Sequence, residues 1–302
     1  MFNSRNIRQV LLFCVSLIWM ASPALAQSQA QVIQQMKETI EKLEMHAEKD
    51  EREREMALGR DVYKAACMTC HGIKGDGNGP SAKFLDPKPR NFTNGIFKWR
   101  TTAYGQLPTE EDLERTIREG VSGTDMFPFG DILSRKSRIA VANYVMRFSP
   151  KFEDPKTNQP KPVLTMNPKR TFPPSEASAA KGKTLFATKG CTACHGNDAD
   201  GNGPAGAALK DSWGEPVKPW DFTVGYYKSG PNDADLFRTI TTGPYGTPMP
   251  GYGPMTSEEE RWNLVDYVRS VSNRRSDGLV SGMMTYLFRE EPSGRVYKEP
   301  AR

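Results

Sequence analysis

The sequence contains the spacing C-x-x-C-H twice, at residues 67–71 and 191–195. In this spacing, two thiols on one helical turn bond to the two vinyl groups of a porphyrin, which is how haem c is attached. The histidine that follows then lies under the ring, where an imidazole nitrogen can bind iron. The sequence therefore predicts two covalently bound haem c groups. Their attachment residues are Cys67, Cys70, Cys191 and Cys194, and the iron ligands are His71 and His195.

Two other uses of the cysteines have to be weighed. In an exported chain, four cysteines would ordinarily indicate two disulfides. A four-cysteine zinc site could use the same thiols, but it would leave both following histidines unexplained. The chain has five cysteines and three histidines. The two motifs use every cysteine except Cys14 and every histidine except His46. Haem attachment is favoured because it accounts for the cysteines and the histidines together.

A methionine lies at the same place after each motif. The segments Gly-Thr-x-Met end at Met126 and Met249, which follow His71 and His195 by 55 and 54 residues. Methionine usually fills gaps in a core, but a thioether also suits haem iron and raises its reduction potential. Because both methionines share one local context, we predict that Met126 and Met249 are the second axial ligands. Two filled axial positions are typical of an electron carrier.

Both motifs belong to a larger internal duplication. A chain of 302 residues has room for roughly two domains of ~150 residues. Three further segments recur in order: D-G-N-G-P at 76–80 and 200–204, P-x-[ND]-F-T at 89–93 and 219–223, and D-L-x-R-T-I at 112–117 and 235–240. Thr109 and Asn232 predict helix starts, and Gly120 and Gly243 predict helix ends. Apolar residues then recur at helical spacing before residues 150 and 273, and alternating strand patterns are missing, so the fold class is all-α.

These features together resemble class I c-type cytochrome domains, over roughly residues 58–150 and 177–273. The resemblance rests on Gly-x-x-x-aromatic at 59–63 and 182–186, the C-x-x-C-H motifs, the methionine segments, and a last helix with a tyrosine. It implies that Gly59 and Gly182 let the first helix of each domain cross close to the last helix, near Tyr144 and Tyr267.

The same resemblance implies a role for two prolines and ranks the two methionine sites. The backbone carbonyls of Pro80 and Pro204 are expected beside the iron-binding histidines, where they would orient the rings. Met249 matches the family's methionine loop closely. Met126 departs from it, with Asp125 where proline is common and Phe127 after the ligand.

The rest of the chain predicts export and flanking segments. Residues 1–26 have a positive start, an apolar run and Ala-Leu-Ala, typical of a signal peptide cleaved after Ala26. This predicts a periplasmic protein without an integral membrane domain, and an uncleaved anchor is the alternative. Residues 27–57 are predicted as a charged helical extension, 151–176 as a Pro/Lys-rich linker and 274–302 as a C-terminal tail. A net charge of +5 and a mean hydropathy of −0.62 argue against a nucleic-acid binder or a polytopic membrane protein.

The predicted function is a periplasmic di-haem carrier of single electrons between exported redox proteins. The repeated segments are similar to cytochromes that accompany molybdenum oxidoreductases, which suggests such a partner. A di-haem peroxidase is the enzyme alternative, but its mobile histidine could only be His46. Thiosulfate-oxidising di-haem enzymes need a cysteine ligand that this chain lacks without Cys14. A fixed subunit of a larger oxidoreductase complex is the third alternative.

Basic and aromatic residues beside the F-T segments are candidate partners of the haem propionates, through charge-assisted hydrogen bonds. These candidates are Lys98, Trp99, Arg100, Lys218 and Trp220.

Overall fold

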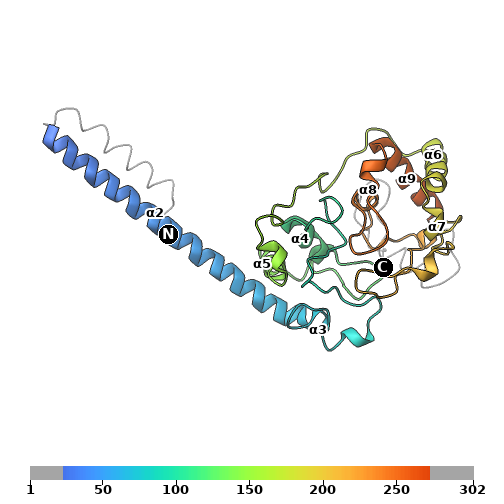
Figure 1. The fold of residues 1–302 in the computed structure, drawn as a ribbon, viewed down its shortest axis with the longest axis horizontal. Helices are drawn as coiled ribbons and strands as arrows, with labels where there is room; N and C mark the ends of the chain where they lie inside the picture. Colours follow the sequence, from blue (N-terminus) through green and yellow to red (C-terminus); the bar gives the residue numbers. More distant parts are fainter. Residues whose placement is uncertain (1–22, 273–302) are drawn as a thin grey trace, which may run out of the picture. The chain divides into compact units, whose positions relative to one another are not determined.

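The computed structural model describes residues 23–272 (Figure 1). The predicted C-terminal tail and all but residues 23–26 of the predicted signal peptide lie outside this part. The chain divides into two compact units, residues 1–55 and 56–302. None of the helices in residues 23–272 is long and apolar enough to cross a membrane.

Helix α2 (Pro23–Ala66) contains the predicted helical extension and continues past residue 57 without a break. From residue 31 to the end of the first unit its side chains are mostly exposed, charged and apolar ones alike. Ion pairs join residues one turn apart, such as Lys49 with Glu53 at 3.8 Å. Each pair of this spacing stabilises a solvated helix by about 0.2–0.5 kcal/mol. Local charge pairs therefore contribute to the stability of the extension.

The second unit is helical, and it contains the two repeats one after the other. Apart from two isolated β-bridges, the described residues contain no strand pairing, so the predicted all-α fold is confirmed. The first repeat contains the end of α2, then α3 (Met68–His71), η1 (Ala82–Phe84), α4 (Glu110–Glu119), α5 (Arg135–Met146) and η2 (Pro150–Phe152). The second contains α6 (Glu176–Thr188), α7 (Thr192–His195), η3 (Gly206–Ala208), η4 (Phe222–Val224), α8 (Asp233–Thr242), η5 (Gly253–Met255) and α9 (Glu258–Val271).

The helices begin and end where their capping residues allow. Thr109 caps α4 with a capping box, since Asp112 N donates to Thr109 Oγ1 at 3.1 Å and Thr109 N donates back to the Asp112 carboxylate at 2.9 Å. Ser257 and Glu260 form a second capping box at the start of α9. Gly120 ends α4 with φ +66°, a conformation that glycine adopts without steric cost.

Two glycines allow the first and last helices of each repeat to cross in contact. A Cβ on Gly59 would lie 2.1 Å from the carbonyl oxygen of Ala140 in α5, and one on Gly182 would lie 1.9 Å from that of Asn263 in α9. Tyr144 and Tyr267 are the next neighbours, at 3.0 and 2.8 Å. The predicted crossing is therefore confirmed in both repeats.

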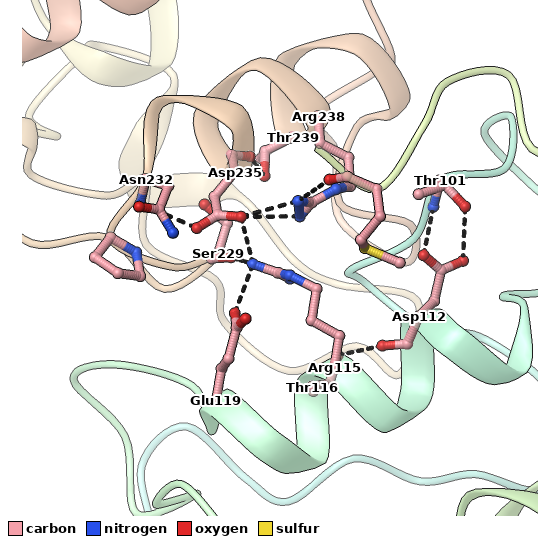
Figure 2. A network of polar contacts seen from close by, with 12 residues as sticks. Thr101, Asp112, Arg115, Thr116, Glu119, Ser229, Asn232, Asp235, Arg238 and Thr239 are labelled. Atoms are coloured by element: carbon pink, nitrogen blue, oxygen red, sulfur yellow. Dashed lines mark hydrogen bonds and ion pairs between the residues drawn. The ribbon is translucent and has the colours of Figure 1, made fainter. Parts of the chain in front are cut away.

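The two repeats pack together through buried charged groups. Figure 2 shows Arg115 on α4 reaching Asp235 on α8, where the two form an ion pair. Arg115 also donates to the carbonyl oxygen of Ser229 at 3.0 Å, and Arg238 pairs with Asp235 at 2.9 Å. These side chains are at most 6% exposed, so a low-dielectric contact joins the repeats.

The predicted linker lies against the second repeat and contacts the first. Arg170 pairs with Asp266 of α9 at 2.6 Å, and the carbonyl oxygen of Met166 accepts a hydrogen bond from Arg238 at 2.7 Å. Val163 N donates to the carbonyl oxygen of Thr101 at 2.8 Å. The connection therefore adds contacts to both repeats.

Candidate haem sites

Each C-x-x-C-H segment folds into a single helical turn. His71 N donates to Cys67 O at 2.9 Å, and His195 N donates to Cys191 O at 2.9 Å. This turn places the two cysteines and the histidine of a motif on one short stretch of backbone. The four thiols are not paired with one another, and burial raises the pKa of Cys67 to about 12.

Both motifs open into apolar cavities, of about 200 Å³ in the first repeat and about 220 Å³ in the second. Each cavity is lined by all four predicted haem-binding residues of its own repeat. These are Cys67, Cys70, His71 and Met126 in the first cavity, and Cys191, Cys194, His195 and Met249 in the second. Because the thiol pairs lie in separate cavities, the four cysteines cannot form one zinc site.

A backbone carbonyl orients each histidine ring. His71 Nδ1 lies 3.0 Å from Arg90 O, and His195 Nδ1 lies 3.2 Å from Trp220 O. A carbonyl oxygen only accepts, so Nδ1 carries the proton and Nε2 keeps its lone pair for a metal. Burial lowers the pKa of both histidines, which also favours the neutral, metal-binding form.

The prediction that Pro80 and Pro204 supply these carbonyls is therefore wrong. The signal was present in the sequence, because Arg90 and Trp220 hold the same position in the repeated P-x-[ND]-F-T segment. The phenylalanine of that segment stacks on the histidine. The ring centroids lie 4.5 Å apart for His71 and Phe92 and 4.7 Å apart for His195 and Phe222.

The methionine segments adopt the same turn in both repeats. Thr124 Oγ1 donates to Val121 O at 2.7 Å, and Met126 N donates to Thr124 Oγ1 at 3.2 Å. In the second repeat Thr247 makes the equivalent bonds, of 2.8 Å to Pro244 O and 3.3 Å from Met249 N. Thus Asp125, which departs from the family pattern, leaves the turn before Met126 unchanged.

The propionate candidates separate into two groups. Lys98 and Trp99 line both cavities, and Lys218 and Trp220 line the second. Arg100 lines neither cavity. It is 1% exposed and donates to the carbonyls of Thr242 and Gly243 at 2.9 and 3.0 Å, so its prediction as a propionate partner is wrong. Lys228, which also lines both cavities, was missed from the sequence.

Each repeat matches the sequence profile of a known protein family. The sequence profile described as "Cytochrome c" matches residues 179–272. The profile described as "Cytochrome C oxidase, cbb3-type, subunit III" matches residues 54–145. A solved chain from the Kuenenia stuttgartiensis reducing HAO-like protein complex Kustc0457/Kustc0458 is 40% identical, with a TM-score of 0.67 over 71% of this chain and 96% of that one.

The chain belongs to the c-type cytochromes. It is a di-haem cytochrome with two tandem cytochrome c domains and two covalently bound haem c groups. The thiol pairs, the Nδ1-bonded histidines and the apolar walls fit that group in both domains.

Curated relatives share this cytochrome's domains within longer chains. The Azospirillum brasilense cbb3-type cytochrome c oxidase subunit CcoP is 27% identical over 72% of the cytochrome and 62% of its own length. The Azorhizobium caulinodans subunit FixP is 27% identical over 71% and 59%. The cytochrome therefore spans about three fifths of these relatives.

Proposed function

We propose that this cytochrome carries single electrons between exported redox proteins through two six-coordinate haems. His71 and Met126 would hold the iron of the first domain, and His195 and Met249 would hold that of the second. The observation that carries the proposal is the lining of each cavity, which unites two thiols, one histidine and one methionine of the same domain. When bound, each haem supplies a one-electron iron couple.

The residues of the chain tune that couple. The carbonyls of Arg90 and Trp220 hold the histidines in the tautomer that leaves Nε2 for iron. The thioethers of Met126 and Met249 raise the reduction potential. Apolar walls would keep water from the iron. These walls include Phe92, Leu113 and Val141 in the first cavity and Phe222, Leu236 and Val268 in the second. These features favour a carrier over an enzyme.

Optical spectra of the purified protein test this assignment. An absorption band near the red end of the visible reports methionine–iron bonding. We expect Met126→Ala to remove about half of it, Met249→Ala the other half, and the double variant all of it. The control is Met255→Ala, since Met255 is 52% exposed and lines neither cavity. A high-spin spectrum of the unaltered protein would contradict the carrier assignment, as would rapid turnover of hydrogen peroxide.

A second proposal concerns how permanently the partner is bound. Similarity to a chain of a HAO-like complex, almost over that chain's full length, favours a fixed subunit of a larger oxidoreductase complex over a freely diffusing carrier. Co-purification with a larger enzyme after native extraction is the expected result. Recovery of a monomer that exchanges electrons rapidly with soluble partners would contradict it. A molybdenum oxidoreductase as the partner stays a prediction, as does export through a signal peptide cleaved after Ala26.

A further inference from the structure

The two haem cavities share part of their walls. Lys98 and Trp99 of the first domain and Lys228 of the second line both cavities. One lysine of each domain thus lines the cavity of the other domain as well as its own. The cavities adjoin at these residues, and a charge placed there acts on both.

The two shared lysines are the same residue of the duplicated sequence. Both domains read F-T-x-G-x-aromatic-K, at residues 92–98 and 222–228. The aromatic residue before each lysine, Phe97 or Tyr227, is buried at 6% or 3% exposure. It anchors the backbone so that the next side chain reaches the contact between the domains. Duplication of one segment therefore produced a reciprocal pair.

Among the residues that the structure describes, no carboxylate lies at ion-pair distance from the positive charge at this contact. Within residues 23–272, no ion pair up to 4.0 Å involves Lys98 or Lys228. Lys228 Nζ instead lies 4.7 Å from the ring centroid of Trp220.

Burial and nearby cations make this charge costly. Burial, Arg90 and Lys228 lower the pKa of Lys98 to about 8 against an opposing effect of Asp211. Burial lowers that of Lys228 against an opposing effect of Asp86. Partly buried ammonium groups without a carboxylate at ion-pair distance are unfavourable, so the site is suited to an anion.

We infer that Lys98 and Lys228 bind the propionate carboxylates of both haems and set the two reduction potentials jointly across the domain contact. The inference rests on the two haems of the proposed function, but not on which residues ligate iron. A cation near iron favours the reduced state, which carries one positive charge less, and so it raises the potential. Each lysine is therefore expected to raise the potentials of both domains.

Spectroelectrochemical titration of the haem-loaded full-length protein tests this, with each potential assigned to its domain by NMR of the haem methyl groups. We expect Lys98→Gln to lower both midpoint potentials, and Lys228→Gln to do the same. Two matched lysines each line one cavity: Lys88 only the first and Lys218 only the second. Lys88→Gln and Lys218→Gln are expected to shift at most the potential of their own domain.

Charge is separated from packing by Lys98→Arg, which keeps the positive charge and is expected to hold both potentials near those of the unaltered protein. The inference is overturned if Lys98→Gln and Lys228→Gln each move one potential only, or neither. It is also overturned if Lys98→Arg lowers both potentials as far as Lys98→Gln does. Absence of the methionine–iron band from the spectrum of the unaltered protein would instead contradict the proposed iron ligands. Failure of the proposed ligands is thus distinguishable from failure of the inference about the two lysines.

Discussion

Arg115 and Asp235 form a buried ion pair that joins the two cytochrome c domains, with side chains 6% and 1% exposed. Asp235 also pairs with Arg238, and Arg115 with Glu119 at 2.8 Å (Figure 2). The carboxylate of Asp235 is therefore shared by an arginine from each domain. Neutralisation of Asp235 therefore removes the carboxylate that pairs with Arg238 and leaves Arg115 with Glu119 alone, whereas loss of Arg115 leaves Asp235 with Arg238.

This asymmetry predicts unequal costs for the two partners. Removal of one partner from a buried pair costs about 3–5 kcal/mol, and we expect Asp235→Asn to lower the free energy of unfolding by this much. Arg115→Met should cost less. The measurement is denaturant unfolding of the haem-loaded protein. The control is Lys181→Met, which breaks an exposed pair with Glu259, 64% and 63% exposed, and should cost less than about 1 kcal/mol. Equal effects of all three variants would refute the shared role of Asp235.

Arg100 offers an independent test of the domain contact. Its guanidinium donates to the carbonyl oxygens of Thr242, the last residue of α8, and of Gly243, which follows it. Hydrogen bonds to a charged group contribute about 1.5–3 kcal/mol, and we expect Arg100→Met to destabilise the protein by about that amount. Arg100→Lys should restore only part of it, because lysine lacks the planar fork of donors. Unfolding followed at the haem absorption bands measures both. Full restoration by lysine would show that charge alone matters at this position.

The crossing of α6 and α9 predicts strong intolerance at Gly182. A Cβ would lie 1.9 Å from the carbonyl oxygen of Asn263, so the helices must separate. We expect Gly182→Ala to cost about 1–3 kcal/mol or more, as overpacked cores do. Lys183→Ala, on the exposed side of the same helix, should stay within about 0.5 kcal/mol. Thermal or denaturant midpoints give both values, and a tolerated Gly182→Ala would mean that the helices have room to move.

Haem stoichiometry tests the attachment residues. Replacement of Cys191 and Cys194 by serine removes both thiols that can form thioether bonds in the second domain. We expect the covalently bound haem to fall from two groups to one per chain, measured from the pyridine haemochrome after acid–acetone extraction. Replacement of Cys67 and Cys70 by serine should also leave one covalently bound haem per chain, in this case the haem of the second domain. Retention of two extraction-resistant haems by either variant would contradict the assignment.

Local features of the site were predictable because they depend on residues close together in the chain. One helical turn brings Cys67, Cys70 and His71 together whatever surrounds them. The Gly-Thr-x-Met turn is closed by the hydroxyl of Thr124 within a few residues. Repetition of both patterns then identified two copies of one all-α domain. The wrong prediction for Pro80 and Pro204 concerned a contact across a long loop, where Arg90 lies 19 residues from His71.

The sequence by itself determined the two attachment motifs, the methionine candidates and the duplication. Only the tertiary structure decided that Arg100 caps α8 of the other domain, and that Lys98 and Lys228 line both cavities. The physical reason is that these contacts depend on how the two copies pack on each other. That packing comes from buried charges and side-chain shapes brought together over more than a hundred residues, which leaves no periodicity or short spacing in the sequence.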